Sequence, residues 1–407
     1  MGKTLVKRSY KYRFYPTVAQ RMELLRTFGC VRKVYNLALE ARSRAWADDR
    51  RHVNYSETSA MLTSWKKSAE LAYLAEVSSV PLQQALRHLQ SAFNAFFSKR
   101  SKYPRFKSKK RTRASAEYTR SAFRYSDGVL KLAKMTEPLS VVWSRPLPDG
   151  AVPSTVTVWR DSADRWFVSI LVESVVEHHL PTADAVGLDA GITTLLTLST
   201  GEKITNPKHT DRERKRLARA QRALNRKCHG SSNREKARLK VARIHSKIGD
   251  RRRDYLHKVT TRLVRENQAV VIEDLAVQNM IKNRRLAQAI LDAGWSDLRS
   301  MLEYKCAWYG RELIVVDRWS PSSKTCSRCG IVVEKLPLHV REWRCRGCGA
   351  RHDRDINAAR NILAAGLAVS ACGADVRPQQ GSSPERAIGC EAGTARRESG
   401  GNPVLQG

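Results

Sequence analysis

Two Cys-x-x-Cys pairs constrain the fold of this chain more than any other feature. Fifteen residues separate the pairs, whose members are Cys326, Cys329, Cys345 and Cys348. Such pairs at this spacing are typical of a zinc ribbon, in which each pair sits on a tight turn and four thiolates close a tetrahedral Zn²⁺ site. Gly330 and Gly349 follow the two pairs and suit the positive φ that such a turn uses. We therefore expect a small lobe built around one zinc ion.

Two disulfides or a redox pair are the alternatives to zinc. Disulfides suit secreted chains, and the sequence shows no secretory signal. The other five of the nine cysteines follow no evident pattern, which favours a reducing compartment. We therefore expect a cytoplasmic setting. A closed Cys₄ site leaves no open coordination position, so this zinc should be structural and the chemistry should lie elsewhere.

The charge of the chain predicts a polyanionic partner. Lys and Arg number 74 against 39 Asp and Glu, a formal net charge of +35. Nucleic acid is the expected partner, because no apolar run approaches the roughly eighteen residues of a membrane span. Residues 203–265 alone carry 22 basic and 5 acidic residues on apolar positions at helical spacing. We expect long basic helices there, with a turn at 230–232.

A second basic stretch, residues 101–113, interleaves seven cations with aromatic rings. Cations can meet phosphates while rings stack on bases, so this stretch favours contact with a nucleic-acid strand. The alternative is a disordered basic linker. The expected contact residues are Lys102, Tyr103, Arg105, Phe106 and Lys107.

Hydrophobic periodicity predicts an α/β chain with several domains. Residues 3–15 alternate like a strand, residues 17–100 show helical spacing, and residues 120–175 return to strand patterns that could pair with the first strand in a small barrel. Further strands are expected near 185–205, 269–273 and 313–316, with a helix from Leu291 to Tyr309. Beyond Gly366 the composition is rich in Gly, Ser, Pro and Arg and predicts disorder.

Acidic residues end two of these apolar strands and begin the last helix. Asp189 lies inside an apolar strand, where a carboxylate is costly unless it binds a metal or a partner. Glu273 and Asp274 end another strand, and because side chains alternate, only one of them can meet Asp189. Asp353 and Asp355 open the last helix, where one of the two can serve as a cap.

Oxygen ligands of this kind are what Mg²⁺ prefers. Two Mg²⁺ ions can clamp the attacking water and the leaving oxygen of an in-line displacement at phosphorus. Carboxylates at strand ends in a chain with this charge therefore indicate phosphodiester hydrolysis, with Asp189, Glu273 and Asp355 as the proposed ligands.

The combination of motifs resembles the TnpB (OrfB) proteins of bacterial insertion sequences, relatives of the type V CRISPR effector nucleases. The stretches that carry the resemblance are G-L-D-A-G at 187–191, V-I-E-D-L at 271–275, the Cys₄ ribbon and D-R-D-I-N-A-A-R-N at 353–361, with Y-K-Y-R-F-Y-P-T at 10–17, Y-P-R-F-K-S-K at 103–109 and A-C-G-A-D-V at 371–376. In that family the third acid lies two residues before the Asn of N-A-A, which selects Asp355 over Asp353.

The resemblance implies a wedge β-barrel interrupted by a helical recognition insert, then an RNase H-like (RuvC) nuclease domain that carries the ribbon. The implied barrel comprises residues 1–16 and 115–182, and the helix-turn-helix-like insert with the basic linker comprises residues 17–114. The implied nuclease domain comprises residues 183–319 and 352–366, the zinc ribbon residues 320–351, and the disordered tail residues 367–407.

The implied activity is RNA-guided cleavage of double-stranded DNA, with a guide RNA made from the protein's own element, structural Zn²⁺ and catalytic Mg²⁺. The implied location is the bacterial cytoplasm, with association with the nucleoid when the protein is bound to DNA. No membrane partner is expected, and the sequence sets no oligomeric state. The first rival is a transposase that uses the same acids for strand transfer. A nuclease-inactive DNA-binding regulator should have lost the acids, and an RNA-binding structural protein would need none. A tyrosine transposase would need a His-x-His pair, which the sequence lacks.

Overall fold

The computed structural model describes residues 2–337, 339–371 and 389–390, which form two compact units. The N-terminal unit comprises residues 7–174 with the described residues 389–390. The C-terminal unit comprises the described residues from 2–6 and 175–371. The chain passes between the units within β1 (Lys3–Phe14) and β7 (Trp166–Glu177). Among the described residues, none of the helices has the length and apolarity needed to span a membrane.

The sheet of the N-terminal unit has the strand order β15-β1-β7-β6-β2, with β5 also paired to β1. Its further strands are β2 (Ala114–Thr119), β5 (Val141–Val142), β6 (Pro153–Arg160) and β15 (Gly389–Cys390). A separate hairpin joins β3 (Phe123–Ser126) to β4 (Val129–Leu132). Alternate residues of β1, Tyr10, Tyr12 and Phe14, are buried against β6, β7 and the start of α1. Period-two burial of this kind is what the alternating sequence predicted.

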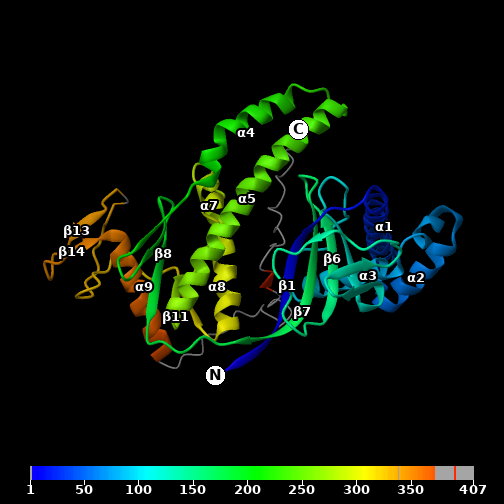
Figure 1. The fold of residues 1–407 in the computed structure, drawn as a ribbon. Coiled ribbons are helices and arrows are strands. Elements are labelled where there is room, and N and C mark those ends of the chain that lie inside the picture. The colour runs from blue at the N-terminus through cyan, green and yellow to red at the C-terminus, as the bar shows by residue number, and fades with distance from the viewer. Residues whose placement is uncertain (1, 338, 372–388, 391–407) are drawn as a thin grey trace. The chain divides into compact units, whose positions relative to one another are not determined.

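Helices fill the interval between β1 and β2, which belong to the same sheet (Figure 1). They are α1 (Val18–Asp49), α2 (Tyr55–Lys67), the 3₁₀ helix η1 (Ala69–Ala75) and α3 (Ser79–Phe97), followed by the short 3₁₀ helix η2 (Arg120–Ala122) after β2. A capping box at Thr17 and Gln20 begins α1 directly after Pro16. Leu39, Leu62 and Leu86, from α1, α2 and α3, share one apolar core. The helices are therefore an insertion with a core of its own.

The C-terminal unit is built on a second sheet of order β10-β9-β8-β11-β12. The strands are β8 (Ala185–Ala190), β9 (Thr194–Leu198), β10 (Lys203–Thr205), β11 (Ala269–Glu273) and β12 (Glu312–Val316). β8 pairs antiparallel with β9, whereas β8, β11 and β12 run parallel. The carboxyl ends of β8 and β11 therefore meet at one edge of the sheet.

Helices cover both faces of this sheet (Figure 1). One face packs on α5 (Ser232–Glu266), α7 (Ala287–Ala293) and α8 (Trp295–Tyr309), and the other packs on α9 (Arg354–Ala371). α4 (His209–Asn225) joins α5 in a long helical hairpin, and the short α6 (Val277–Met280) follows β11. Gly187 of β8 lets α9 lie directly on the strand, since a Cβ there would stand 2.2 Å from the carbonyl oxygen of Ala359.

Two expectations about element boundaries need correction. The helix predicted from Leu291 to Tyr309 is two helices, because Gly294 adopts φ 69° and ends α7 before α8 begins. The tail predicted to be disordered from 367 is helical as far as Ala371, since α9 continues along the sheet, and Gly389–Cys390 form β15. Residues 372–388 and 391–407 of that prediction lie outside the described residues.

Candidate metal sites

The two Cys-x-x-Cys pairs form turns with the same hydrogen bonds. In the first, Gly330 N–H donates to the Cys326 carbonyl and Cys326 N–H donates to Ile331. In the second, Gly349 N–H donates to the Cys345 carbonyl and Cys345 N–H donates to Ala350. Gly330 and Gly349 have φ of 77° and 70°, the left-handed conformation expected of them. The second turn joins β13 (Glu342–Arg344) to β14 (Arg351–Asp353).

These turns bring the four sulfur atoms within 4.8 Å of one another. The Cys326 and Cys348 sulfurs are 3.7 Å apart and those of Cys329 and Cys345 are 3.6 Å apart. A tetrahedron with Zn–S bonds of about 2.3 Å has sulfurs about 3.8 Å apart, so the cluster fits zinc. All four are free cysteines, which excludes the disulfide alternative in this structure. His352 Nε2 lies 3.0 Å from Cys326 Sγ and borders the cluster.

Two asparagines of α9 bind the ribbon to this helix. Asn357 Oδ1 accepts the N–H of Ser327, and Asn357 Nδ2 donates to the Thr325 carbonyl. Asn361, one turn later, donates to the carbonyls of Thr325 and Ser322. Sequence reasoning missed this role, although Asn at i and i+4 of an amphipathic helix was the signal that could have revealed it.

The two aspartates at the start of α9 have different surroundings. Asp353 Oδ1 accepts the backbone N–H groups of Asp355 and Ile356, and its Oδ2 is 2.6 Å from Lys203 Nζ. Asp353 is therefore the cap of α9. Among the described residues, the side chain of Asp355 has one hydrogen-bond or ion-pair partner, Arg341 Nη1 at 3.4 Å.

The carboxylates of Asp189 and Glu273 lie at the same end of neighbouring strands. β8 and β11 are parallel, and Leu188 lies opposite Ile272. The next residue on each strand is an acid, so Asp189 and Glu273 lie side by side on neighbouring strands about 4.8 Å apart. Asp189 shares a sheet face with Gly187, and Glu273 shares it with Val271. α9 packs on this face at both positions. Ala359, which contacts Gly187, is one helical turn from Asp355, so α9 brings Asp355 toward this edge.

The electrostatics agree with this convergence. Burial, together with the negative charges of Asp355 and Glu273, raises the pKa of Asp189 to about 7. Arg354 and Arg341 act in the opposite direction but do not cancel the effect. Burial also raises the pKa of Glu273, with a contribution from Asp274. A cation bound among these carboxylates would relieve their mutual repulsion, so the donor set fits a hard metal ion such as Mg²⁺.

Asp274 points to the opposite side of the sheet and binds two arginines. Its Oδ1 accepts from Arg299 of α8 at 2.5 Å, and its other oxygen accepts from Arg318. Burial raises the pKa of Asp274, but the two guanidinium groups outweigh burial and leave the pKa below its usual value. Of the two acids at the end of β11, Glu273 is thus the one on the face that carries Asp189.

The basic stretch 101–113 is held against the helical insert. Asn36 of α1 exchanges two hydrogen bonds with the backbone of Lys107, and Pro104 is buried. Lys107 Nζ lies 3.9 Å from the centre of the Tyr35 ring, and Tyr103 packs edge-on against Phe93 and Phe96. Lys102, Arg105 and Phe106 are exposed. Tyr103 is 45% exposed as well, so four of the five expected contact residues face solvent. Tyr103 and the half-buried Lys107 also dock the segment.

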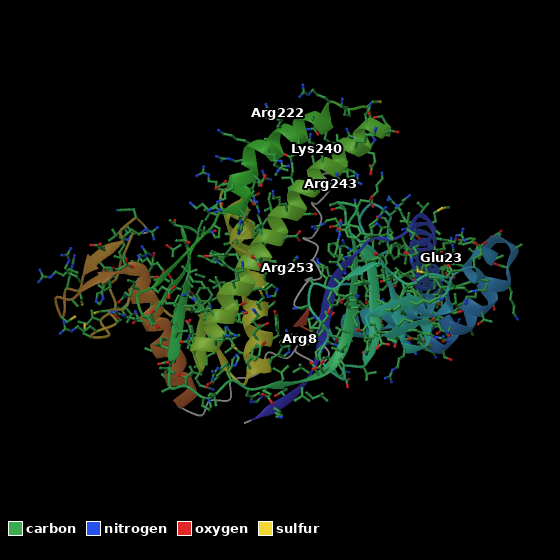
Figure 2. The ribbon with its side chains drawn as sticks, in the orientation of Figure 1. Arg8, Glu23, Arg222, Lys240, Arg243 and Arg253 are labelled. Carbon is green, nitrogen blue, oxygen red and sulfur yellow. The ribbon has the colours of Figure 1, made fainter. Side chains whose placement is uncertain are left out.

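A row of cations follows one side of the α4–α5 hairpin. On α5 the exposed residues Lys236, Lys240, Arg243 and Lys247 recur at helical spacing, a set called here the α5 stripe. None of the four has an ion-pair partner among the residues that the structure describes. Figure 2 shows Lys240 and Arg243 on α5 and Arg222 on the neighbouring α4. An apolar seam that includes Leu217, Ile244 and Ile248 holds the two helices together.

Comparison with known proteins gives consistent matches along the chain. The family model OrfB_IS605, described as "Probable transposase", matches residues 169–284. A model described as "Cas12f1-like, TNB domain" matches residues 295–362, and one described as "Helix-turn-helix domain" matches residues 1–51.

Two curated relatives cover nearly the whole chain. A Streptomyces pristinaespiralis protein named "Putative RNA-guided DNA endonuclease" is 68% identical over 93% of this chain and 94% of its own length. The Escherichia coli K12 protein "Putative RNA-guided DNA endonuclease InsQ" is 36% identical over 90% of this chain and 94% of its own length. Among solved structures, a Cas12f1–sgRNA–target DNA complex matches with TM-score 0.54 at 16% identity, over 84% of this chain and 83% of that one. This last likeness shows a shared mixed α/β fold.

Proposed function

Because this chain belongs to the TnpB (OrfB) family, we propose that it is an RNA-guided endonuclease that cuts DNA with the carboxylates Asp189, Glu273 and Asp355. The single observation that supports this site is the convergence of β8, β11 and α9 at one edge of the sheet. In this proposal the C-terminal unit is an RNase H-like (RuvC) domain. The sheet of the N-terminal unit is a wedge β-barrel that carries the helical recognition insert.

Mg²⁺ bound by the three carboxylates would polarise the scissile phosphate and activate the attacking water. The chain's own contribution is to hold the three oxygen donors in place before substrate arrives. Asp189 and Glu273 are fixed by strand pairing, and Asp355 is fixed by the packing of α9 on Gly187. The ribbon, with Zn²⁺ on its four cysteines, anchors the same helix through Asn357 and Asn361.

The proposed partners are a guide RNA from the protein's own element and double-stranded target DNA. The net charge of +35 and the α5 stripe supply phosphate contacts without sequence preference. Base pairing with the guide would then provide most of the sequence specificity.

The acids at the start of α9 provide a matched test of the site. The protein is purified with RNA transcribed from its own element and given a plasmid library of target sites with Mg²⁺. Asp355→Asn and Asp189→Ala should lower cleavage at least about 10³-fold and leave RNA binding unchanged. Asp353→Asn should keep most of the cleavage, because Asn also caps helices. Equal cleavage by Asp355→Asn and wild type would refute the assignment.

Strand transfer is the second candidate, favoured by the family description "Probable transposase". The same carboxylates could direct a DNA 3′-OH at the phosphate in place of water. The products separate the two reactions: hydrolysis leaves free ends, whereas transfer joins the ends of two DNA molecules. Joined ends from the purified protein would replace the hydrolytic proposal.

A further inference from the structure

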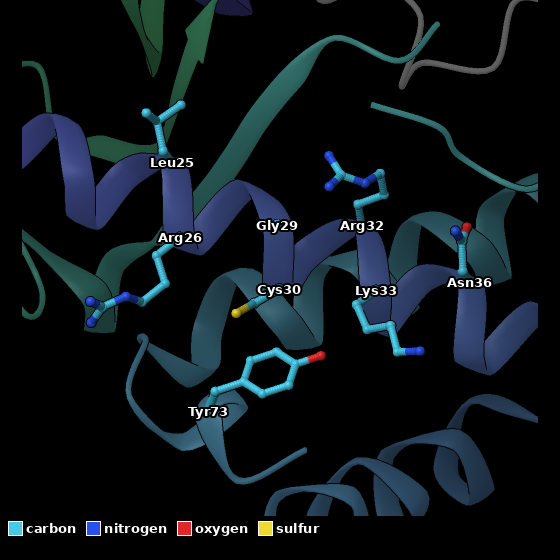
Figure 3. A pocket seen from close by; sticks show the side chains of 8 residues that line it. All are labelled: Leu25, Arg26, Gly29, Cys30, Arg32, Lys33, Asn36 and Tyr73. Atoms are coloured by element: carbon cyan, nitrogen blue, oxygen red, sulfur yellow. The ribbon is translucent and has the colours of Figure 1, made fainter. Parts of the chain in front are cut away.

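A pocket of about 400 Å³ opens between α1 and η1 in the N-terminal unit (Figure 3). It shares no residue with either candidate metal site. Its lining residues are Leu25, Arg26, Gly29, Cys30, Arg32, Lys33, Asn36 and Tyr73. Arg26 of α1 pairs at 3.1 Å with Glu76, the residue that follows η1, and so links the two walls. The volume lies within the usual range of small-ligand sites, about 300–1,000 Å³.

The charge of the lining suits an anion. None of the eight lining residues is acidic, and Glu76 neutralises Arg26. Arg32 and Lys33 form no ion pair with any residue that the structure describes, which leaves two uncompensated positive charges. The amide of Asn36 is already bonded to the backbone of Lys107. The basic stretch 101–113 is thereby anchored at the rim of this pocket.

The remaining surfaces suit a flat, partly apolar group. Tyr73 is 39% exposed and Leu25 is 36% exposed, although most large apolar side chains of this unit are in its core. Figure 3 shows the Tyr73 ring beside Cys30 with its hydroxyl toward Lys33. Burial, with help from Glu76 and Glu23, raises the pKa of Cys30, so its thiol stays protonated and is a wall of the pocket rather than a nucleophile.

Gly29 is the residue that packing does not explain. Glycine inside a helix costs about 1 kcal/mol relative to alanine. Many helical glycines are needed where another chain segment approaches, but nothing lies within 4 Å of a Cβ built at position 29. The free space in front of Gly29 is the pocket itself, so any side chain there would project into the volume a ligand would fill.

From these observations we propose that the pocket binds one unpaired nucleotide of a nucleic-acid strand. The base would stack on Tyr73, and its phosphate would be held by Lys33, which extends from α1 on the side where Tyr73 lies in Figure 3. Arg32 extends from the other side of α1 and would contact an adjacent phosphate of the same strand. The strand would continue along residues 101–113, where Arg105 and Phe106 face solvent. RNA and single-stranded DNA share this chemistry. Which strand occupies the pocket, guide RNA or target DNA, rests on the proposed function. Binding of an unpaired nucleotide in the pocket does not.

Photo-crosslinking tests the pocket in the full-length protein. The probes are twelve-nucleotide strands that carry one 4-thiouridine (RNA) or one 4-thiothymidine (DNA). The reaction is run without Mg²⁺, and mass spectrometry then identifies the peptides that are crosslinked. The wild type should crosslink at residues 25–36 or 69–76. Gly29→Leu should reduce that crosslink about tenfold, the loss of roughly one stacked base. Ala47→Leu adds the same side chain at an exposed position of α1 outside the pocket and should leave it unchanged.

Tyr73 provides a second pair of variants, to be used if circular dichroism shows that Gly29→Leu does not fold. Tyr73→Phe keeps the ring and should keep the crosslink, whereas Tyr73→Ala should lose it. Absence of a wild-type crosslink at these residues with both strands, or a full crosslink in folded Gly29→Leu or Tyr73→Ala, overturns the proposal. A crosslink with only one strand type identifies the ligand. Because the readout does not involve cutting, failure here leaves the nuclease proposal standing, and inactivity of the nuclease leaves the pocket standing.

Discussion

Asp189 differs from an ordinary strand residue because its charge is disfavoured in the metal-free fold. Its pKa is raised from 3.8 to about 7 by burial and by the charges of Asp355 and Glu273. The folded state therefore binds this proton more tightly than the unfolded state. The resulting stabilisation is complete below about pH 4 and is lost as the pH rises through 7.

Asp189→Asn should consequently stabilise the metal-free protein at neutral pH. Asn keeps a neutral group at every pH, so the gain in the free energy of unfolding should grow between pH 4 and 7 and then level off. The shift corresponds to at most about 4 kcal/mol, reduced by the partial exposure of the site. Denaturant unfolding in Mg²⁺-free buffer between pH 5 and 8 measures it. A difference between variant and wild type that does not vary with pH would show that neither burial nor the acidic neighbours raise the pKa of Asp189.

The two aspartates of α9 show why composition alone could not choose between them. Both lie at a helix start, and resemblance to the family favoured Asp355. In the structure, the Asp353 carboxylate accepts two backbone N–H groups and Lys203, so three of its roughly four acceptor positions are already in use. The oxygen atoms of Asp355 have no such backbone partners among the described residues and remain available to a cation.

At the scale of elements, the contact between β8 and α9 sets the position of Asp355. Gly187→Ala would place a Cβ 2.2 Å from the Ala359 carbonyl and 2.7 Å from the Leu363 nitrogen, so the helix must move. We expect a loss of about 1–3 kcal/mol in stability. Cleavage should fall further than this loss explains, because Asp355 moves with the helix.

Gly249→Ala is the control for Gly187→Ala. Gly249 lies within α5, and nothing is within 4 Å of its added Cβ. This substitution should raise stability by about 0.5–1 kcal/mol and leave cleavage unchanged. Thermal unfolding and plasmid cleavage measure both variants. If Gly187→Ala cleaved as well as Gly249→Ala, close packing of α9 on β8 would not be required.

The ribbon and α9 should respond together when the zinc site is removed. Substituting Ser for both Cys326 and Cys329 removes two of four sulfur ligands, so zinc content by mass spectrometry should fall from about one ion per chain to none. Cleavage should fall as well, because Asn357 and Asn361 bind the loop that the first cysteine pair stabilises. Cys228→Ser, at an exposed cysteine between α4 and α5, should retain the zinc. Full zinc content in the double variant would exclude the ribbon site.

At the scale of the whole molecule, the excess positive charge should appear as salt-dependent binding. Each phosphate contact contributes about 0.7–0.9 to the steepness of the plot of log K, where K is the DNA-binding constant, against the logarithm of the salt concentration. Replacing the four residues of the α5 stripe by Gln should therefore reduce the slope by about 3, measured by fluorescence anisotropy with labelled DNA.

A variant with equal charge loss separates the stripe from net charge. In this control variant, Gln replaces four cations outside the stripe, each of which is paired with an acidic residue in the structure: Lys3, Lys7, Arg44 and Lys258. This control variant should change the slope of log K against log salt by less than one unit. Equal effects of the two variants would mean that total charge, and not the stripe, governs binding.

Local chemistry explains which features could be predicted from sequence. The ribbon followed from cysteine spacing and two glycines, because each turn is made within a few residues. Most strands of both sheets and the long basic helices followed from periodicity, because burial repeats every two or 3.6 residues. Two strands of the first sheet, β2 and β15, were not predicted. The break at Gly294 was missed, since one glycine can interrupt a helix without changing its apolar pattern.

The sequence by itself determined the four clustered cysteines, the excess of cations and the presence of acids at strand and helix ends, all of which are properties of short segments. Only the tertiary structure decided which of these acids share an edge, which aspartate is used as a cap, and that Gly29 faces an open pocket. The physical reason is that these relations join residues as far apart as Asp189 and Asp355, and no local pattern encodes the packing of a helix on a distant strand.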